Sequence, residues 1–165
     1  MEGREGRRLM VPLLAVNSVV YVVTVGLASW SLDKYIDGHQ DHPHLGGNPS
    51  TIFLLVYALI AGVIGASSIL LGFLHLHLWN NASLPPASTS AIISWAITAL
   101  AFGLVCKQIT MGGHRGKRLQ TLEAFIAISG LSQLLYLLLL HAGMFSARYG
   151  PAYTNTTGES YVQTV

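Results

Sequence analysis

Apolar residues are grouped along this chain into four long runs, separated by polar connections. The runs cover residues 9–30, 51–75, 88–109 and 122–145. A helix rises about 1.5 Å per residue, so about 20 residues cross the roughly 30 Å hydrocarbon core of a bilayer, and each run is long enough. None of them shows the alternation of apolar and polar residues that a barrel strand requires. The pattern predicts an all-α membrane protein, a bundle of four transmembrane helices with short loops.

The segments outside the runs complete the predicted organisation. Residues 1–8 form a basic N-terminal segment, residues 9–145 the four-helix transmembrane domain, and residues 146–165 a polar tail that we expect to be disordered. The first run resembles a signal peptide because arginines precede it. It is longer than the roughly 7 to 15 apolar residues of such a segment, so we expect it to be retained as a helix.

Composition narrows the class of protein further. The chain is 52% hydrophobic and 10% charged, against roughly 25% charged residues in an average soluble domain, which excludes a soluble globular protein. Nine basic residues against seven acidic ones form no basic stripe, so we expect the lipid bilayer and no nucleic acid as a partner. The single Cys106 excludes an intrachain disulfide. No nucleotide-binding or catalytic motif is present, and we expect no enzyme activity, cofactor or metal.

The orientation in the membrane follows only partly from charge. An even number of spans places both termini on one side. Lysine and arginine are nearly balanced, with Arg4, Arg7, Arg8 and Arg148 on the side of the termini and Lys34, Lys107, Arg115, Lys117 and Arg118 on the other. We favour cytoplasmic termini because the first helix usually dominates. Glycosylation of the sequons at Asn81 or Asn155 would favour the opposite orientation.

Small residues recur at helical spacing in the second and third runs. Such surfaces let two helices approach closely. We expect them to pack helices within the bundle or between the subunits of a homo-oligomer: Ala58, Gly62, Ala66 and Gly65 in the second run, and Ala99 and Gly103 in the third.

Two charged residues lie near the membrane boundary. Lys107 is close to the end of the third run and Glu123 is at the start of the fourth, so an antiparallel pair of helices would bring them to one level. Three interpretations remain open. The two residues form an ion pair; or Lys107 extends to the interface while Glu123 favours the positive end of its helix dipole; or they handle an anion or a proton.

Uncharged polar residues lie deeper in the runs. Tyr57, Gln133 and Tyr136 either form hydrogen bonds between helices or line a path for a small, partly apolar solute. In the long first loop, His39, His42 and His44 have a spacing that permits transition-metal binding or a response to mild acid. The glycine-rich loop does not force their rings together, so we expect no metal site there.

Several short segments together resemble a known family of plant membrane proteins, the AWPM-19-like family. It is named for a plasma-membrane polypeptide of wheat that abscisic acid induces. The resemblance covers about residues 9–145. It is carried by the runs GLASWSL, GGN, ALIAGVIGAS, CKQI with GG, LEAF, and QLLY followed by LHAG, at residues 26–32, 46–48, 58–67, 106–109 with 112–113, 122–125, and 133–136 with 140–143.

The resemblance implies a four-span plasma-membrane protein, abundant in maturing seeds and induced by abscisic acid, drying and cold. It also implies uptake of abscisic acid, or alternatively a non-transporting protein that stabilises the membrane during desiccation. A carrier of this weak acid needs a cation for the carboxylate in an otherwise apolar path. From chemistry and position, Lys107 is the candidate anchor and Glu123 its competitor or proton site. Tyr57, Gln133 and Tyr136 are the candidate polar partners.

Overall fold

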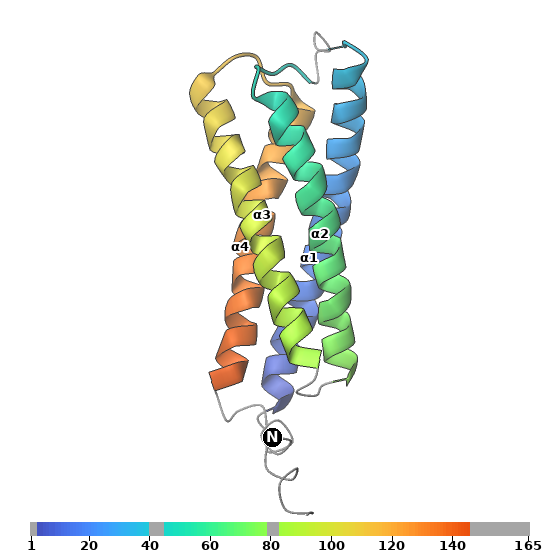
Figure 1. Ribbon diagram of the computed structural model, residues 1–165, viewed down its shortest axis with the longest axis vertical. Helices are drawn as coiled ribbons and strands as arrows, with labels where there is room; N and C mark the ends of the chain where they lie inside the picture. Colours follow the sequence, from blue (N-terminus) through green and yellow to red (C-terminus); the bar gives the residue numbers. More distant parts are fainter. Residues whose placement is uncertain (1–2, 40–44, 79–82, 146–165) are drawn as a thin grey trace, which may run out of the picture.

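Four long helices account for nearly all of the structure. A computed structural model of the chain describes residues 3–39, 45–78 and 83–145. The helices are α1 (Gly3–Ile36), α2 (Thr51–Leu78), α3 (Leu84–Met111) and α4 (Lys117–Phe145), and they run side by side along the long axis of the molecule (Figure 1). Each is long and apolar enough to cross a membrane. The prediction of an all-α bundle of four transmembrane helices is confirmed.

The helices extend beyond the apolar runs in the sequence. They have 34, 28, 28 and 29 residues, which corresponds to about 42 to 51 Å at about 1.5 Å per residue. A hydrocarbon core of roughly 30 Å covers only part of that length. The helix ends therefore carry charged residues such as Asp33 and Lys34 outside the hydrocarbon, where water or headgroups solvate them.

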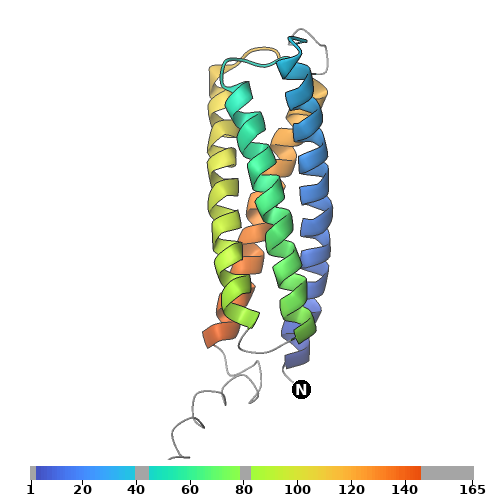
Figure 2. The same cartoon turned by 45° about the vertical axis from the view of Figure 1, so that its right-hand side comes forward.

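The bundle has an antiparallel up-and-down arrangement. Each helix packs against its neighbours in sequence, and α1 also packs against α4, so the four helices enclose a common interior (Figures 1 and 2). The first residue of α1 and the last residue of α4 lie at the same end. Large apolar side chains such as Val19, Leu70 and Leu131 are exposed on the outside. A bilayer would cover these outer faces.

Helices α1 and α2 approach each other closely at two glycines of α2. A side chain at Gly62 would place its Cβ 2.5 Å from a methyl group of Val25, and one at Gly65 would collide with the ring of Tyr21. Ala58 is also buried, whereas Ala66 is half-buried. Ala99 and Gly103 of α3, which we expected to offer a matching surface, are exposed on the outer face instead. Gly62 and Gly65 of α2 therefore meet a valine and a tyrosine of α1.

Two loops join at the end of the bundle opposite the chain termini. The backbone N–H of Gly47 donates to the carbonyl of His114 at 2.8 Å, and that of Gly116 donates to Leu45 at 2.9 Å. We call residues 45–50 and 112–116 together the clasp. Gly46 has a φ of +57°, and a Cβ there would collide with the His114 carbonyl. Glycine is therefore required where the two loops meet.

Asn48 ties the clasp to two helices. Its side-chain nitrogen donates to the carbonyls of Gln108 at 3.2 Å and Gly112 at 3.0 Å, at the end of α3. Its side-chain oxygen accepts the backbone N–H of Ser50 at 3.0 Å, just before α2. The last carbonyls and first N–H groups of helices lack partners within the helix. One side chain thus satisfies backbone groups at the end of one helix and the start of another.

Candidate functional site

A layer of polar side chains crosses the middle of the bundle, and we call it the central layer. Every helix contributes to it, and its members are buried: Asn17 and Tyr21 from α1, Ser68 from α2, Ser94 and Thr98 from α3, and Ser132 and Gln133 from α4. The hydroxyl of Ser132 donates to Asn17 Oδ1 at 2.5 Å. Gln133 Nε2 donates to Ser68 Oγ at 3.4 Å. The Tyr21 hydroxyl lies 3.3 Å from Ser94 Oγ.

These hydrogen bonds connect helices that are neighbours and helices that are diagonally opposed. Ser132 and Asn17 join α4 to α1, whereas Gln133 and Ser68 join α4 to α2. In hydrocarbon a polar group without a partner is costly, so such bonds favour one packing arrangement of the helices. The central layer therefore has an evident structural role.

A second group of buried polar side chains lies below the clasp, and we call it the clasp-side layer. It consists of Ser31 on α1, Gln108 on α3 and Glu123 on α4. Counted from the helix ends at this side of the bundle, Ile36, Met111 and Lys117, they lie about 7.5, 4.5 and 9 Å deep at about 1.5 Å per residue. They therefore face the interior at similar depths.

The clasp-side layer is poor in hydrogen bonds. Within the described part of the chain, Ser31 Oγ, both side-chain polar atoms of Gln108, and Glu123 Oε1 are buried without a hydrogen-bond partner. A buried polar atom left unpaired costs about 1–3 kcal/mol. The layer thus places donors and acceptors around the bundle axis that the protein's own groups do not satisfy.

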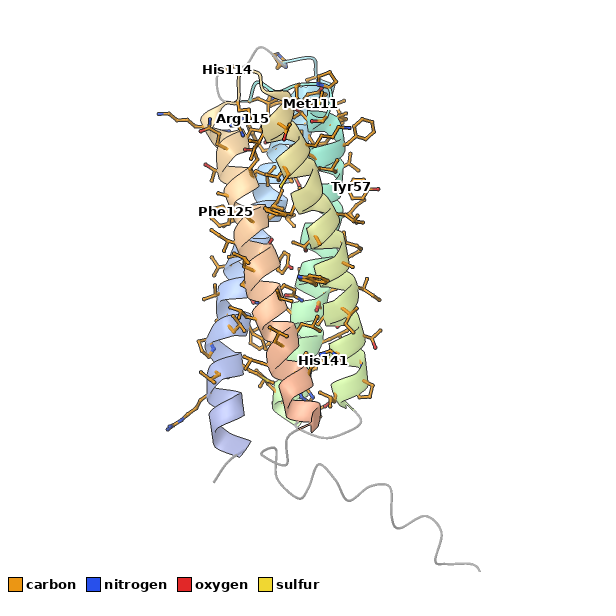
Figure 3. The ribbon with its side chains drawn as sticks, turned by 90° about the vertical axis from the view of Figure 1, so that its left-hand side faces the viewer. Tyr57, Met111, His114, Arg115, Phe125 and His141 are labelled. Atoms are coloured by element: carbon orange, nitrogen blue, oxygen red, sulfur yellow. The ribbon has the colours of Figure 1, made fainter. Side chains whose placement is uncertain are left out.

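One charge interaction closes this layer. Arg115, in the clasp, donates from Nη1 to Glu123 Oε2 at 2.9 Å. The arginine side chain is 26% exposed and that of the glutamate 7%. Figure 3 shows Arg115 and His114 at the end of the bundle opposite His141. The pair therefore connects the water-facing loop with the buried layer.

The structure separates the two charged residues that the sequence placed at one level. Glu123 is buried as part of the clasp-side layer, but its ion-pair partner is Arg115. Lys107 is exposed. Consecutive helix residues point about 100° apart, so the inward position belongs to Gln108, the next residue. The interpretation of Lys107 and Glu123 as an ion pair is thus not what the described residues show.

The three uncharged candidates also divide between inside and outside. Tyr57 is 39% exposed and its side chain points away from the bundle (Figure 3). Gln133 is buried and bonded to Ser68. Tyr136 is buried, and its hydroxyl lies 2.6 Å from where a Cβ on Gly72 would be. Gly72 thus leaves the space that the tyrosine ring end occupies.

Three residues of the clasp-side layer and its ion pair escaped the sequence analysis. Ser31 and Gln108 lie at run ends, where polar residues are ordinary. Arg115 belongs to a basic connection between runs, and only the pairing of the two loops turns it toward Glu123. If Lys107 is placed on the outer face of its helix, the next residue, Gln108, points about 100° away from it and is a candidate for the inward position. No comparable signal existed for Arg115.

The loop histidines fall mostly outside the described residues. His42 and His44 are not among them, and His39 is exposed. In the ranges that the structure describes, no three His, Cys, Asp or Glu residues are grouped as a metal site would need. The sequons at Asn81 and Asn155 and the tail after residue 145 also lie outside the described residues.

An apolar groove lies on the outer surface between α1 and α4, at the end of the bundle that holds the chain termini. Its volume is about 630 Å³. It carries no charged side chain, being lined by Leu9, Pro12, Leu13, Val16, Leu135, Leu138 and Leu139. Its lining residues themselves offer no anchor for a carboxylate.

The exposed apolar faces, the four spans and the polar interior define a multi-pass membrane protein of the four-helix-bundle class. The model of the AWPM-19-like family matches residues 15–143. The chain belongs to that family. It is also similar to Membrane protein PM19L of Oryza sativa subsp. japonica, with 49% identity over 144 residues, which are 87% of this chain and 83% of the relative. No solved structure matches this chain.

Proposed function

We propose that this protein mediates uptake of abscisic acid across the plasma membrane in the response of plant tissue to abscisic acid and dehydration. Membership of the AWPM-19-like family supports the setting. The observation that carries the proposal is the clasp-side layer, which places the Arg115–Glu123 pair and buried polar groups without partners among the described residues at the same end of an apolar bundle. A carboxylate with an apolar ring needs this combination to leave water.

The proposed path runs from the clasp toward the central layer. Arg115 takes the role of anchor for the carboxylate in place of Lys107, because its guanidinium contacts the buried layer. Glu123 competes for that anchor. Gln133 and Tyr136, buried further along α4, are the proposed polar partners for the remainder of the solute.

The exposed candidates, Lys107 and Tyr57, have a place in the proposal only if a second copy of the chain packs against them. Four helices leave little room for a site that opens alternately to either side, so we propose that the carrier is a homo-oligomer. The outward surface of Ala99 and Gly103 on α3 would allow a second helix to approach closely. Lys107 and Tyr57 would then be covered by the neighbouring subunit.

The test is uptake of radiolabelled abscisic acid into liposomes that contain the purified protein, with and without an inward proton gradient. Protein-free vesicles give the background. We expect saturable uptake above that background, lost in Arg115→Gln and retained in Lys107→Ala, because Arg115 contacts the buried layer and Lys107 is exposed on the outer face. Uptake equal to that of protein-free vesicles, from protein shown to be folded, would contradict the proposal.

A second candidate function is stabilisation of the membrane during desiccation without transport. The exposed Lys117 and Arg118 beside the clasp favour it, because basic residues at a membrane surface attract anionic lipid when they face the cytoplasm. The guanidinium of Arg118 lies 3.8 Å from the centre of the Trp30 ring. This function predicts that stress protection survives Lys107→Ala and Glu123→Ala, and that the clasp is cytoplasmic. A carrier with cytoplasmic termini has the clasp outside.

A further inference from the structure

The ion pair below the clasp uses only part of the binding capacity of its two members. A guanidinium carries five N–H donors and can bind both oxygens of a carboxylate. Here Arg115 reaches one oxygen of Glu123, and the other, Oε1, is buried without a partner. The pair is thus less complete than the two-point contact that arginine forms with a free carboxylate.

Two further side chains buried at this end of the bundle have unused hydrogen-bond donors. Gln108 holds a side-chain N–H donor and Ser31 a hydroxyl donor, both buried and both without a partner among the described residues. They come from α3 and α1, the two helices that pack against α4. Counted along their helices, they lie within about 4.5 Å of the depth of Glu123, the partner of Arg115. A carboxylate has the acceptor capacity that these donors require.

The position of Arg115 gives such an anion a way in. The arginine is part of the clasp, and its backbone faces Gly46 of the other loop. Its side chain is partly exposed, whereas Glu123 is buried. Arg115 is therefore accessible from water, whereas its partner Glu123 is not. An incoming anion meets Arg115 before it meets the glutamate.

We propose that the carboxylate of a monocarboxylic acid displaces Glu123 from Arg115, and that the released Glu123 takes up one proton from water. The proposal rests on the proposed function, of which it specifies the site and the coupling. One anion and one proton enter together, so the site gains no net charge. The only covalent bond formed is the O–H bond of Glu123, and the bond that breaks is the one that held the proton on hydronium or on a buffer acid in the water.

The proton uptake follows from burial. A carboxylate that loses its cation in an apolar interior is strongly disfavoured and becomes neutral instead. The charged groups around Glu123 do not replace Arg115. Asp33 on α1 and Asp37, just after the end of that helix, pair with Lys34. Among the described residues, the other charged or histidine side chains at this end are exposed: His39 after α1, Lys107 on α3, His114 in the clasp, and Lys117 and Arg118 on α4, while α2 has no charged residue in this half.

The experiment measures equilibrium binding of radiolabelled abscisic acid to the purified full chain in lipid nanodiscs, and proton uptake in weakly buffered solution with a pH indicator. The wild type is expected to bind more tightly as the pH falls and to take up one proton for each anion bound. Glu123→Gln removes the competing charge at constant shape. It is expected to bind about tenfold more tightly at neutral pH, the equivalent of one pK unit, with no proton uptake.

Variants of Arg115 are expected to weaken binding, whereas Glu123→Gln is expected to strengthen it. Arg115→Gln is expected to abolish binding, and Arg115→Lys to retain part of it, since lysine keeps the charge but not the fork. Lys107→Ala and Lys117→Gln are the matched controls, and they are expected to bind as the wild type does. If Arg115→Gln fails to fold, the double variant with Glu123→Gln removes both charges and is still expected not to bind. His114→Gln tests whether the pH dependence comes from that exposed ring.

Three outcomes would overturn the proposed exchange of Glu123 for the ligand carboxylate. The first is unchanged affinity and unchanged proton uptake in Glu123→Gln. The second is wild-type binding by the Arg115 variants, and the third is loss of the pH dependence in His114→Gln. Radiolabelled benzoate is the second probe, and wild-type protein that binds neither acid also overturns it. If benzoate binds with the expected effects of the variants but abscisic acid is not taken up, the proposed function is contradicted and the exchange is not. If abscisic acid uptake is unaffected by Glu123→Gln and Arg115→Gln, the exchange is contradicted and the proposed function is not.

Discussion

The two buried polar layers of this bundle differ in how far their groups are satisfied. In the central layer Asn17 and Gln133 each have one side-chain atom in a hydrogen bond to another helix, while Asn17 Nδ2 and Gln133 Oε1 have no partner within the described residues. In the clasp-side layer neither polar atom of Gln108 has a partner within the described residues. The first arrangement holds helices together. The second leaves binding capacity beside a charge pair, which is what a site for a ligand requires.

The layers also differ in their distance from water. The central layer lies inside four helices that a bilayer surrounds, whereas a loop residue, Arg115, completes the clasp-side layer. Loops adjust more readily than packed helices because fewer contacts restrain them. In the proposed account, helix packing and ligand exchange take place at separate depths of one bundle.

The largest expected effect comes from the packing region. Gly65→Val would drive a branched side chain into the Tyr21 ring, which a packed interface does not accommodate. We expect a loss of about 3 kcal/mol, at the upper end of the cost of overpacking. Reversible unfolding in sodium dodecyl sulfate measures it. The matched control is Gly103→Val, since nothing lies within 4 Å of a Cβ there, and equal losses in the two variants would contradict the described packing.

The next largest expected effect on stability comes from the ion pair between Arg115 and Glu123. Arg115→Ala leaves the buried Glu123 without a cation, and we expect a loss of about 2 kcal/mol. This is below the roughly 3–5 kcal/mol of fully buried pairs, because the arginine side chain is 26% exposed. The same unfolding measurement applies. Adding Glu123→Gln to Arg115→Ala should restore most of the stability, whereas a double variant no more stable than the single one would speak against the pair.

The smallest effect sharpens the role of the clasp. Asn48→Ala removes the bonds to the carbonyls of Gln108 and Gly112 and the cap on Ser50. We expect a loss of about 1 kcal/mol, typical of a helix cap. Hydrogen exchange at the Gly47 and Gly116 amides should quicken while exchange in the central layer stays the same. Thr110→Ala, an exposed residue bonded within its own helix, should leave both regions unchanged.

Much of the fold was predictable because a bilayer leaves few choices. Any run of about 20 apolar residues must satisfy its backbone internally, so the number and type of elements followed from the four runs. The helix ends did not follow, since α1 continues through Asp33 and Lys34 to Ile36. Hydropathy falls where a helix leaves the hydrocarbon. It gives no further signal at the residue where the helix itself ends.

The candidate site was predictable only in part, because which face of a helix points inward depends on its neighbours. Glu123 was chosen for its charge and is buried. Lys107 was chosen for its depth, but a one-residue step around the helix gives the inward position to Gln108. Tyr57 points outward for the same reason. Arg115 depends on a contact between two loops far apart in sequence, which periodicity within a run does not reveal.

The central claim is that the clasp-side layer binds the solute and the central layer holds the helices. The most direct measurement is equilibrium binding of radiolabelled abscisic acid to two variants in lipid nanodiscs. Arg115→Gln alters the first layer, and Ser132→Ala removes the bond to Asn17 in the second. We expect binding to be lost in Arg115→Gln and unchanged in Ser132→Ala. Binding retained in Arg115→Gln and lost in folded Ser132→Ala would contradict the account.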